Sequence, residues 1–145
     1  MIAVAYPEPK FRIKNENGRQ YIFDPIRKAW LLLTEEEWVR QNFVNYLIHQ
    51  LHYPSTLIAV EKEIRLNDLK KRFDILVYDS KHQPWMLVEC KEPRVNLSEE
   101  VLQQVLRYNI SVPVEYIVIT NGESTTGWKK ESGLTLLSEL PEWKD

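Results

Sequence analysis

The chain has 145 residues, of which 43% are hydrophobic and 28% charged, the size and composition of one compact globular domain. Its net charge of −2 excludes nucleic-acid binding through a uniformly cationic surface, so such a partner would need a local basic patch or a metal ion. The single cysteine, Cys90, excludes an intramolecular disulfide, no apolar run is long enough for a membrane span, and residues 1–10 lack the pattern of a signal peptide. We therefore expect a cytoplasmic protein without membrane contact.

The N-terminal part of the sequence predicts an extended arm followed by a small antiparallel sheet. Residues 1–10 contain two prolines and are expected to form the arm. The alternating segments Phe11–Lys14 and Arg19–Phe23 flank Asn17-Gly18, a dipeptide typical of type I′ hairpin turns. A third strand is predicted at Ala29–Leu33.

A first helix is predicted from Thr34 to about Leu51. Thr34 followed three positions later by Glu37 forms a capping box, and Tyr53-Pro54 ends the helical pattern. The apolar stripe of this helix is predicted to consist of Trp38, Val44, Leu47, Ile48 and Leu51.

Three strands, a second helix and a further strand follow. Because the strand nearest the second helix is almost wholly apolar, we expect it to lie centrally, covered on both faces. This order predicts an α/β sandwich with a mixed sheet, in which an antiparallel meander is joined by a crossover helix to a parallel strand. The predicted elements are strands Ile58–Arg65, Arg72–Asp79 and Trp85–Lys91, a helix Glu99–Asn109 capped by Ser98, and strand Glu115–Thr120.

Glu89 and Lys91 end the central strand and are the first candidates for chemistry. A period of two places both on one face, with Cys90 pointing away. Charges on a central strand are costly to bury, so they indicate either an ion pair at a strand end or a functional site. Asp74 on the neighbouring strand favours the functional site. Counting outward from the turn that joins the two strands pairs Tyr78 with about Trp85 and Asp74 with about Glu89.

Two converging carboxylates predict a site for a hard cation. Mg²⁺ takes one or two carboxylates and fills its octahedron with water and phosphate oxygens. We expect Asp74 and Glu89 to be ligands, with a backbone carbonyl near Cys90 as a further one. Lys91 would position or deprotonate the attacking water, or offset charge on the phosphorane.

Further candidates lie on the second helix and on the turn before Asp74. Gln104 and Tyr108 share a helix face, and Arg107 beside them could hold a phosphate, although a polar edge on an amphipathic helix has the same pattern. The densest basic cluster could follow a phosphate backbone or face only solvent. It consists of Arg65, Lys70, Lys71 and Arg72.

The ordered set Asp74, Glu89-Cys90-Lys91 and Gln104-x-x-x-Tyr108 resembles the signature of the PD-(D/E)XK nuclease superfamily. More narrowly, the sequence is similar to the N-terminal nuclease domain of type I restriction enzyme R (HsdR) subunits. The similarity covers roughly residues 21–122. Its supporting stretches are Asp24–Lys28, Glu36–Gln41, Arg72–Asp74, Leu87–Lys91, Gln104–Asn109 and Thr120–Gly122.

The resemblance implies a restriction-endonuclease-like α/β sandwich that cleaves DNA with Mg²⁺, or with Mn²⁺ in its place. It implies that Asp74 and Glu89 bind the metal, that Lys91 is the catalytic lysine, and that Gln104 and Tyr108 belong to the site. Glu37 is the candidate for an additional helix carboxylate. The candidate nucleic-acid contacts are Arg40, Gln41, Lys71, Arg72 and Arg107.

The resemblance also predicts the domain organisation and the partners. We expect one domain over residues 1–145, with an arm and hairpin over 1–33, a catalytic core over 34–122 and an extension over 123–145 that carries a short strand near Leu134–Leu137. Type I R subunits continue into an ATP-driven motor, but no P-loop is present here, because Gly122–Lys129 fails its pattern. A motor or specificity subunit on a separate chain and a homodimer are both compatible with this.

Two departures from the resemblance leave alternatives open, the missing motor and Phe73. Phe73 stands where the superfamily signature has proline, which is a common variation. An inactive nucleic-acid-binding module on the same fold, or a protein-interaction subunit using the hairpin or the Trp143 end, would need no metal.

Overall fold

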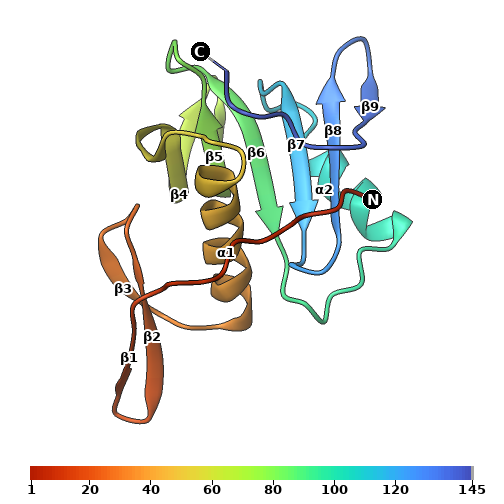
Figure 1. Ribbon diagram of the computed structural model, residues 1–145. Helices are drawn as coiled ribbons and strands as arrows, with labels where there is room; N and C mark the ends of the chain where they lie inside the picture. Colours follow the sequence, from red (N-terminus) through yellow and green to blue (C-terminus); the bar gives the residue numbers. More distant parts are fainter. Residues whose placement is uncertain (145) are drawn as a thin grey trace.

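The computed structural model describes residues 1–144, with Leu66 and Leu69 described by their backbone. Over this range the chain forms a three-stranded antiparallel sheet, β1-β2-β3, and a six-stranded mixed sheet, β4-β5-β6-β7-β8-β9 (Figure 1). Helices α1 and α2 lie on opposite faces of the mixed sheet. The bounds are β1 Ile13–Glu16, β2 Arg19–Asp24, β3 Ala29–Leu32, α1 Glu35–His49, a 3₁₀ turn Ser55–Leu57, β4 Ile58–Leu66, β5 Leu69–Tyr78, β6 Pro84–Cys90, α2 Glu99–Asn109, β7 Tyr116–Thr120, β8 Thr125–Lys130 and β9 Leu134–Leu136.

The small sheet β1–β3 projects from the body of the molecule, and we call residues 11–33 the wing (Figure 1). Asn17 and Gly18 have φ angles of 52° and 78°. Two positive φ angles in a two-residue loop confirm the predicted type I′ turn. The hairpin register pairs Ile13 with Ile22 and Glu16 with Arg19.

Helix α1 begins at the predicted cap. The Oγ1 of Thr34 accepts a hydrogen bond from the Glu37 N–H at 3.0 Å, while the Thr34 N–H donates to the Leu32 carbonyl. The helix ends at His49, two residues before the predicted end. The predicted apolar stripe is wrong at Trp38, which is 37% exposed because it packs edge-on against Phe11 of the wing instead of entering the core.

The mixed sheet has an apolar cluster on each face, which explains why the β6 sequence is almost continuously apolar. Met86 and Val88 pack on the α1 side, and Leu87 packs on the α2 side. Strands β4, β5 and β6 form the predicted antiparallel meander, and β6 pairs with β7 in parallel through α2. The predicted α/β sandwich with a mixed sheet is confirmed.

Strand β8 was not predicted from the sequence. It pairs antiparallel with β7, although its sequence, Thr-Thr-Gly-Trp-Lys-Lys, contains a glycine and ends on two lysines. Gly127 lies in close contact, because a Cβ there would lie 3.3 Å from both Ile2 and Leu140 and their side chains would have to shift by a few tenths of an ångström. The N-terminal arm thus reaches the sheet, and the Ile2 N–H donates to the Thr125 carbonyl at 2.8 Å.

No helix among the described residues is both long and apolar enough to cross a membrane. Cys90 is a buried free cysteine in the cluster on the α1 side, as period two predicts. Burial raises the pKa of its thiol well above the ordinary value. The Cys90 side chain is therefore an unreactive part of the core.

Candidate functional site

Three acidic side chains from different elements meet at one end of the mixed sheet. Glu36 of α1, Glu61 of β4 and Asp74 of β5 each place a carboxylate oxygen within 4.8 Å of the others. We call these three residues the acidic cluster. The first turn of α1 and the C-terminal end of β6 lie at this same end of the molecule, the lower end in Figure 1. Oxygen donors at this spacing are hard ligands, and they fit Mg²⁺ or Mn²⁺.

Arg40 places its guanidinium at the centre of the acidic cluster. The side chain is only 6% exposed. Burial lowers its pKa, but the hydrogen bond to Asp74 and the charge of Glu37 outweigh this effect, and the net shift is upward. Arg40 is therefore a permanent internal cation. Its Nη2 donates to Asp74 at 2.7 Å and to Glu36 and Glu61 at 3.0 Å each, and its Nη1 donates to Glu37 at 2.7 Å.

Asp74 reaches this cluster because strand alternation breaks around it. Val60 pairs with Ile75 and Lys62 with Phe73, but the pair between them is missing. Glu61 has a φ of 49°. As a result Ile75 packs on the α1 side and Phe73, two residues earlier, packs on the α2 side. Such irregularities re-aim side chains in strands, and here they bring the carboxylate of β5 to an arginine of α1.

The ladder between β5 and β6 agrees with the predicted approach of Asp74 to Glu89. Ile75 pairs with Val88, so the next positions outward are Asp74 and Glu89, and Oδ2 of Asp74 accepts a hydrogen bond from the Cys90 N–H at 2.9 Å. The other end of the predicted register is wrong by one residue. Tyr78 pairs with Pro84 because the ladder shifts between Val77 and Tyr78.

Glu89 is a strongly perturbed acid. Burial, together with the negative charge of Asp74, raises the pKa of its carboxyl to about 8, against the opposing charges of Lys91 and Lys71. Burial likewise raises the pKa values of Glu36 and Glu61. These upward shifts show that burial and mutual repulsion of the carboxyls outweigh the attraction of Arg40 and the nearby lysines. That is the electrostatic environment in which a divalent cation binds.

Lys91 follows directly after β6. Its backbone N–H donates to the Thr120 carbonyl at 2.8 Å, which extends the contact between β6 and β7 by one residue. The side chain is half-buried, and its positive charge acts on both Glu36 and Glu89. The structure thus brings Asp74, Glu89 and Lys91 together, as the sequence predicts.

Glu37 occupies a different position from the acidic cluster. It is buried, and its carboxylate accepts hydrogen bonds from Arg27 at 2.6 Å, from Arg40 at 2.7 Å and from Gln41 at 3.1 Å. Its neighbour Glu36 is the α1 residue that joins the cluster. Gln41 is buried by the same network.

The residues predicted on α2 lie beside Lys71 of β5. The Lys71 ammonium is 3.6 Å from the centroid of the Tyr108 ring and donates to the Tyr108 carbonyl. Burial lowers the pKa of Lys71, and the charge of Glu89 opposes this shift. Tyr108 is 68% exposed, and Gln104 and Arg107 are exposed beside it. These side chains border the site on its α2 side.

Two members of the acidic cluster were not selected from the sequence. Glu37 was selected instead of Glu36, because helix periodicity cannot separate adjacent glutamates in a first turn. Glu61 was not considered, although it is an acid that follows the apolar run Ile58–Val60 inside a strand. Arg72, a predicted nucleic-acid contact, is exposed and lies 3.7 Å from Glu61.

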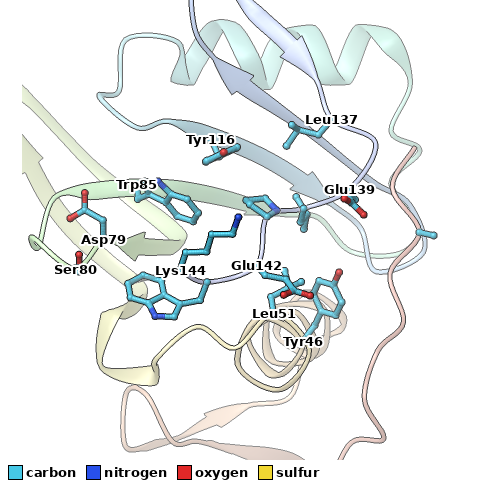
Figure 2. A pocket seen from close by; sticks show the side chains of 14 residues that line it. Tyr46, Leu51, Asp79, Ser80, Trp85, Tyr116, Leu137, Glu139, Glu142 and Lys144 are labelled. Carbon is cyan, nitrogen blue, oxygen red and sulfur yellow. The ribbon is translucent and has the colours of Figure 1, made fainter.

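A separate cavity of about 700 Å³ lies at the opposite end of the sheet and has a different lining (Figure 2). Trp85 and Tyr116 line one side, with Leu51 of the segment after α1 and the C-terminal segment Glu139–Lys144 around them. The acidic cluster contributes nothing to this cavity, so the candidate chemistry lies elsewhere.

A mixed sheet between two helices, with carboxylates and a lysine gathered where its central strand ends, has the architecture of the restriction-endonuclease-like proteins. Residues 35–142 match the family described as type I restriction enzyme R protein N terminus (HSDR_N). The chain belongs to this family, which confirms the resemblance found in the sequence. No curated protein matches the sequence.

Proposed function

We propose that this protein is a metal-dependent DNA endonuclease module that hydrolyses phosphodiester bonds. The observation that carries the proposal is that Glu89 and Lys91 lie beside the acidic cluster, which includes Asp74, at one end of the sheet. Membership of the type I restriction R-protein family supports DNA as the substrate. The same membership supports other subunits of a restriction system as partners. We place the protein in the cytoplasm.

Asp74 and Glu89 are the proposed metal ligands, together with Glu61, Glu36 and the Cys90 carbonyl. When bound, Mg²⁺ or Mn²⁺ supplies a Lewis acid and lowers the pKa of a bound water. Occupation of the acidic cluster requires the Arg40 guanidinium to leave its centre, because Nη2 lies within hydrogen-bond distance of all three carboxylates.

Lys91 is proposed to orient the attacking water and to offset negative charge that develops on the phosphorus centre. Its positive charge lowers the pKa values of Glu36 and Glu89 and so favours their ionised, metal-binding forms. On the α2 side, Lys71, Gln104, Arg107 and Tyr108 are proposed to contact the DNA near the scissile bond. Arg72 and the side chains of Arg40 and Gln41 are proposed contacts once the metal has displaced Arg40.

The test is nicking of supercoiled plasmid by the wild type, Lys91→Ala and Lys81→Ala, each with Mg²⁺, Mn²⁺ or EDTA. Lys81 is an exposed lysine in the β5–β6 turn at the opposite end of β6, so it controls for loss of a positive charge. We expect metal-dependent nicking by the wild type and Lys81→Ala, and a loss of about 100-fold or more in Lys91→Ala. Full activity of Lys91→Ala contradicts the assigned role of the lysine.

Arg40 favours a second candidate, a nucleic-acid-binding module without catalysis. A guanidinium that satisfies three carboxylates at 2.7–3.0 Å stabilises the site without a metal. Calorimetry with Mn²⁺ on the wild type and Asp74→Asn separates the candidates. Binding that is lost in Asp74→Asn supports the nuclease, and DNA binding without Mn²⁺ binding or cleavage supports the inactive module.

A further inference from the structure

The wing carries positive charge in a chain that is negative overall. Between Phe11 and Leu33 the sequence has five basic and two acidic residues, a net charge of +3, whereas the whole chain has −2. Of the two acids, Asp24 is buried against Arg27. Glu16 is exposed and pairs with Lys14 at 3.3 Å, but the exposed cations Arg12, Arg19 and Lys28 outnumber it, so the exposed charge of the wing is mostly cationic.

Strand register collects the cations and the aromatic rings of the wing on one face. Lys14 pairs with Tyr21, and Phe23 pairs with Trp30. The Phe23 N–H donates to the Arg12 carbonyl at 2.9 Å, which places Arg12 in the same row. Paired residues on neighbouring strands share a face, so all five side chains lie on one side of the sheet.

That face is turned away from the body of the protein. Ile22 and Asp24 alternate with Tyr21 and Phe23 along β2, and both are buried. Arg12 is exposed and Lys14 is half-buried. Because the body covers the face that holds Ile22, the cation-bearing face points to solvent, and we call it the outer face.

The aromatic rings hold the two cations in place. The Arg12 guanidinium carbon lies 4.8 Å from the Phe23 ring centroid and 5.3 Å from that of Trp30, and the Lys14 Nζ lies 4.4 Å from the Trp30 centroid. Each cation–π contact reduces the entropy lost when the side chain binds an anion. The cations also cover the rings, so the outer face is suited to phosphates rather than to stacking of unpaired bases.

A continuous set of ion pairs connects the wing to the acidic cluster. Arg27 bonds both Asp24 of β2 and Glu37 of α1, where the distance to Glu37 is 2.6 Å. Glu37 in turn accepts from Arg40, which bonds Asp74. The wing therefore has a defined position beside the site, and Figure 1 shows it projecting past the end of α1 where the cluster lies.

From these observations we propose that the outer face of the wing binds the phosphate backbone of duplex DNA and holds the duplex next to the acidic cluster. The inference rests on the proposed nuclease function. It solves an electrostatic problem of that function, because the site itself repels a polyanion until a metal is bound. Arg12 and Lys14 supply the attraction at phosphates outside the cleaved step.

The test measures binding of a fluorescent duplex as a function of KCl concentration, without Mg²⁺. The wild type is compared with Arg12→Gln/Lys14→Gln, with the charge-preserving Arg12→Lys/Lys14→Arg, and with Lys81→Gln/Lys144→Gln. The last variant removes two exposed lysines at the opposite end of the sheet. Each lost phosphate contact lowers the slope of log K against log salt by about 0.9. We expect a reduction of about 1.8 in the wing variant alone, with binding at least about tenfold weaker at 0.1 M salt.

Several results overturn the inference. One is an unchanged salt slope in Arg12→Gln/Lys14→Gln, and another is an equal loss of DNA affinity in Lys81→Gln/Lys144→Gln. Tighter binding of a single strand than of the duplex would also overturn it, as would sedimentation showing that the wing variant converts a dimer to a monomer. The melting temperature of each variant shows whether it is folded. If the wild type nicks plasmid but the salt slope is unchanged in Arg12→Gln/Lys14→Gln, only the role of the wing is refuted. If the wild type neither binds nor cleaves DNA, the proposed function itself is refuted.

Discussion

The two ends of β6 carry opposite chemistry. Near its start, Trp85 lies in an aromatic group with ring centroids 4.8 Å from Tyr116 and 5.6 Å from Tyr53. At its other end, Glu89 lies among carboxylates around a single guanidinium. Apolar contacts are stabilising wherever they form, but carboxylates crowded around one cation raise the free energy of the folded state. One end stabilises the fold, whereas the other holds carboxyls whose ionised forms a further cation would stabilise.

Removing Arg40 is expected to have the largest effect. Arg40→Met leaves four carboxylates without their shared cation, and loss of one partner of a buried ion pair costs about 3–5 kcal/mol. Millimolar Mg²⁺ is expected to restore part of this stability by binding the vacated centre. Urea unfolding with and without Mg²⁺ measures both effects. A variant that Mg²⁺ does not stabilise contradicts the assignment of the acidic cluster to a metal.

Removing Trp85 tests the other end. Trp85→Ala deletes a half-buried ring that contacts Tyr53 and Tyr116, and the expected loss is about 2–3 kcal/mol, below the range for fully buried tryptophans. Because this end has no proposed ligand, the loss should be the same with and without Mg²⁺. Rescue by Mg²⁺ equal to that of Arg40→Met would remove the distinction between the two ends.

The raised pKa of Glu89 predicts a pH dependence of stability. Between the unfolded pKa near 4.5 and the folded pKa of about 8, the folded state holds a proton that the unfolded state has released. The free energy of unfolding therefore falls with rising pH across this window, by at most about 1.4 kcal/mol per pH unit. Mn²⁺ affinity should rise over the same window, because metal binding releases the proton. Denaturation at several pH values measures this effect, and an identical slope in Glu89→Gln would assign it to another group.

The smallest expected effect concerns Tyr53. Its hydroxyl donates to the Pro141 carbonyl at 2.6 Å and ties the C-terminal segment to the aromatic end. Tyr53→Phe should cost about 1 kcal/mol and leave nicking unchanged. A loss of nicking as large as that of Lys91→Ala would show that the two ends are coupled.

Local signals predicted most elements of the fold. Helix α2 has the predicted bounds because Ser98 accepts the Val101 N–H and caps it. The Asn17-Gly18 turn followed from two residues that tolerate positive φ. Strand β8 was missed because its backbone pairs with β7 although its own residues are poor strand formers, and pairing of this kind is decided by the neighbouring strand.

By itself the sequence determined most of the secondary structure and its order, the pairing of β5 with β6, and hence the approach of Asp74 to Glu89. Each of these features depends on residues close in the chain, so hydrophobic periodicity, helix caps and turn lengths are enough to predict it. Only the tertiary structure decided that Glu36 and Glu61 complete the acidic cluster, that Arg40 occupies its centre, and that the wing turns Arg12 and Lys14 outward. These arrangements depend on an interrupted ladder at Glu61 and on contacts between distant elements, whose free energies no local pattern encodes.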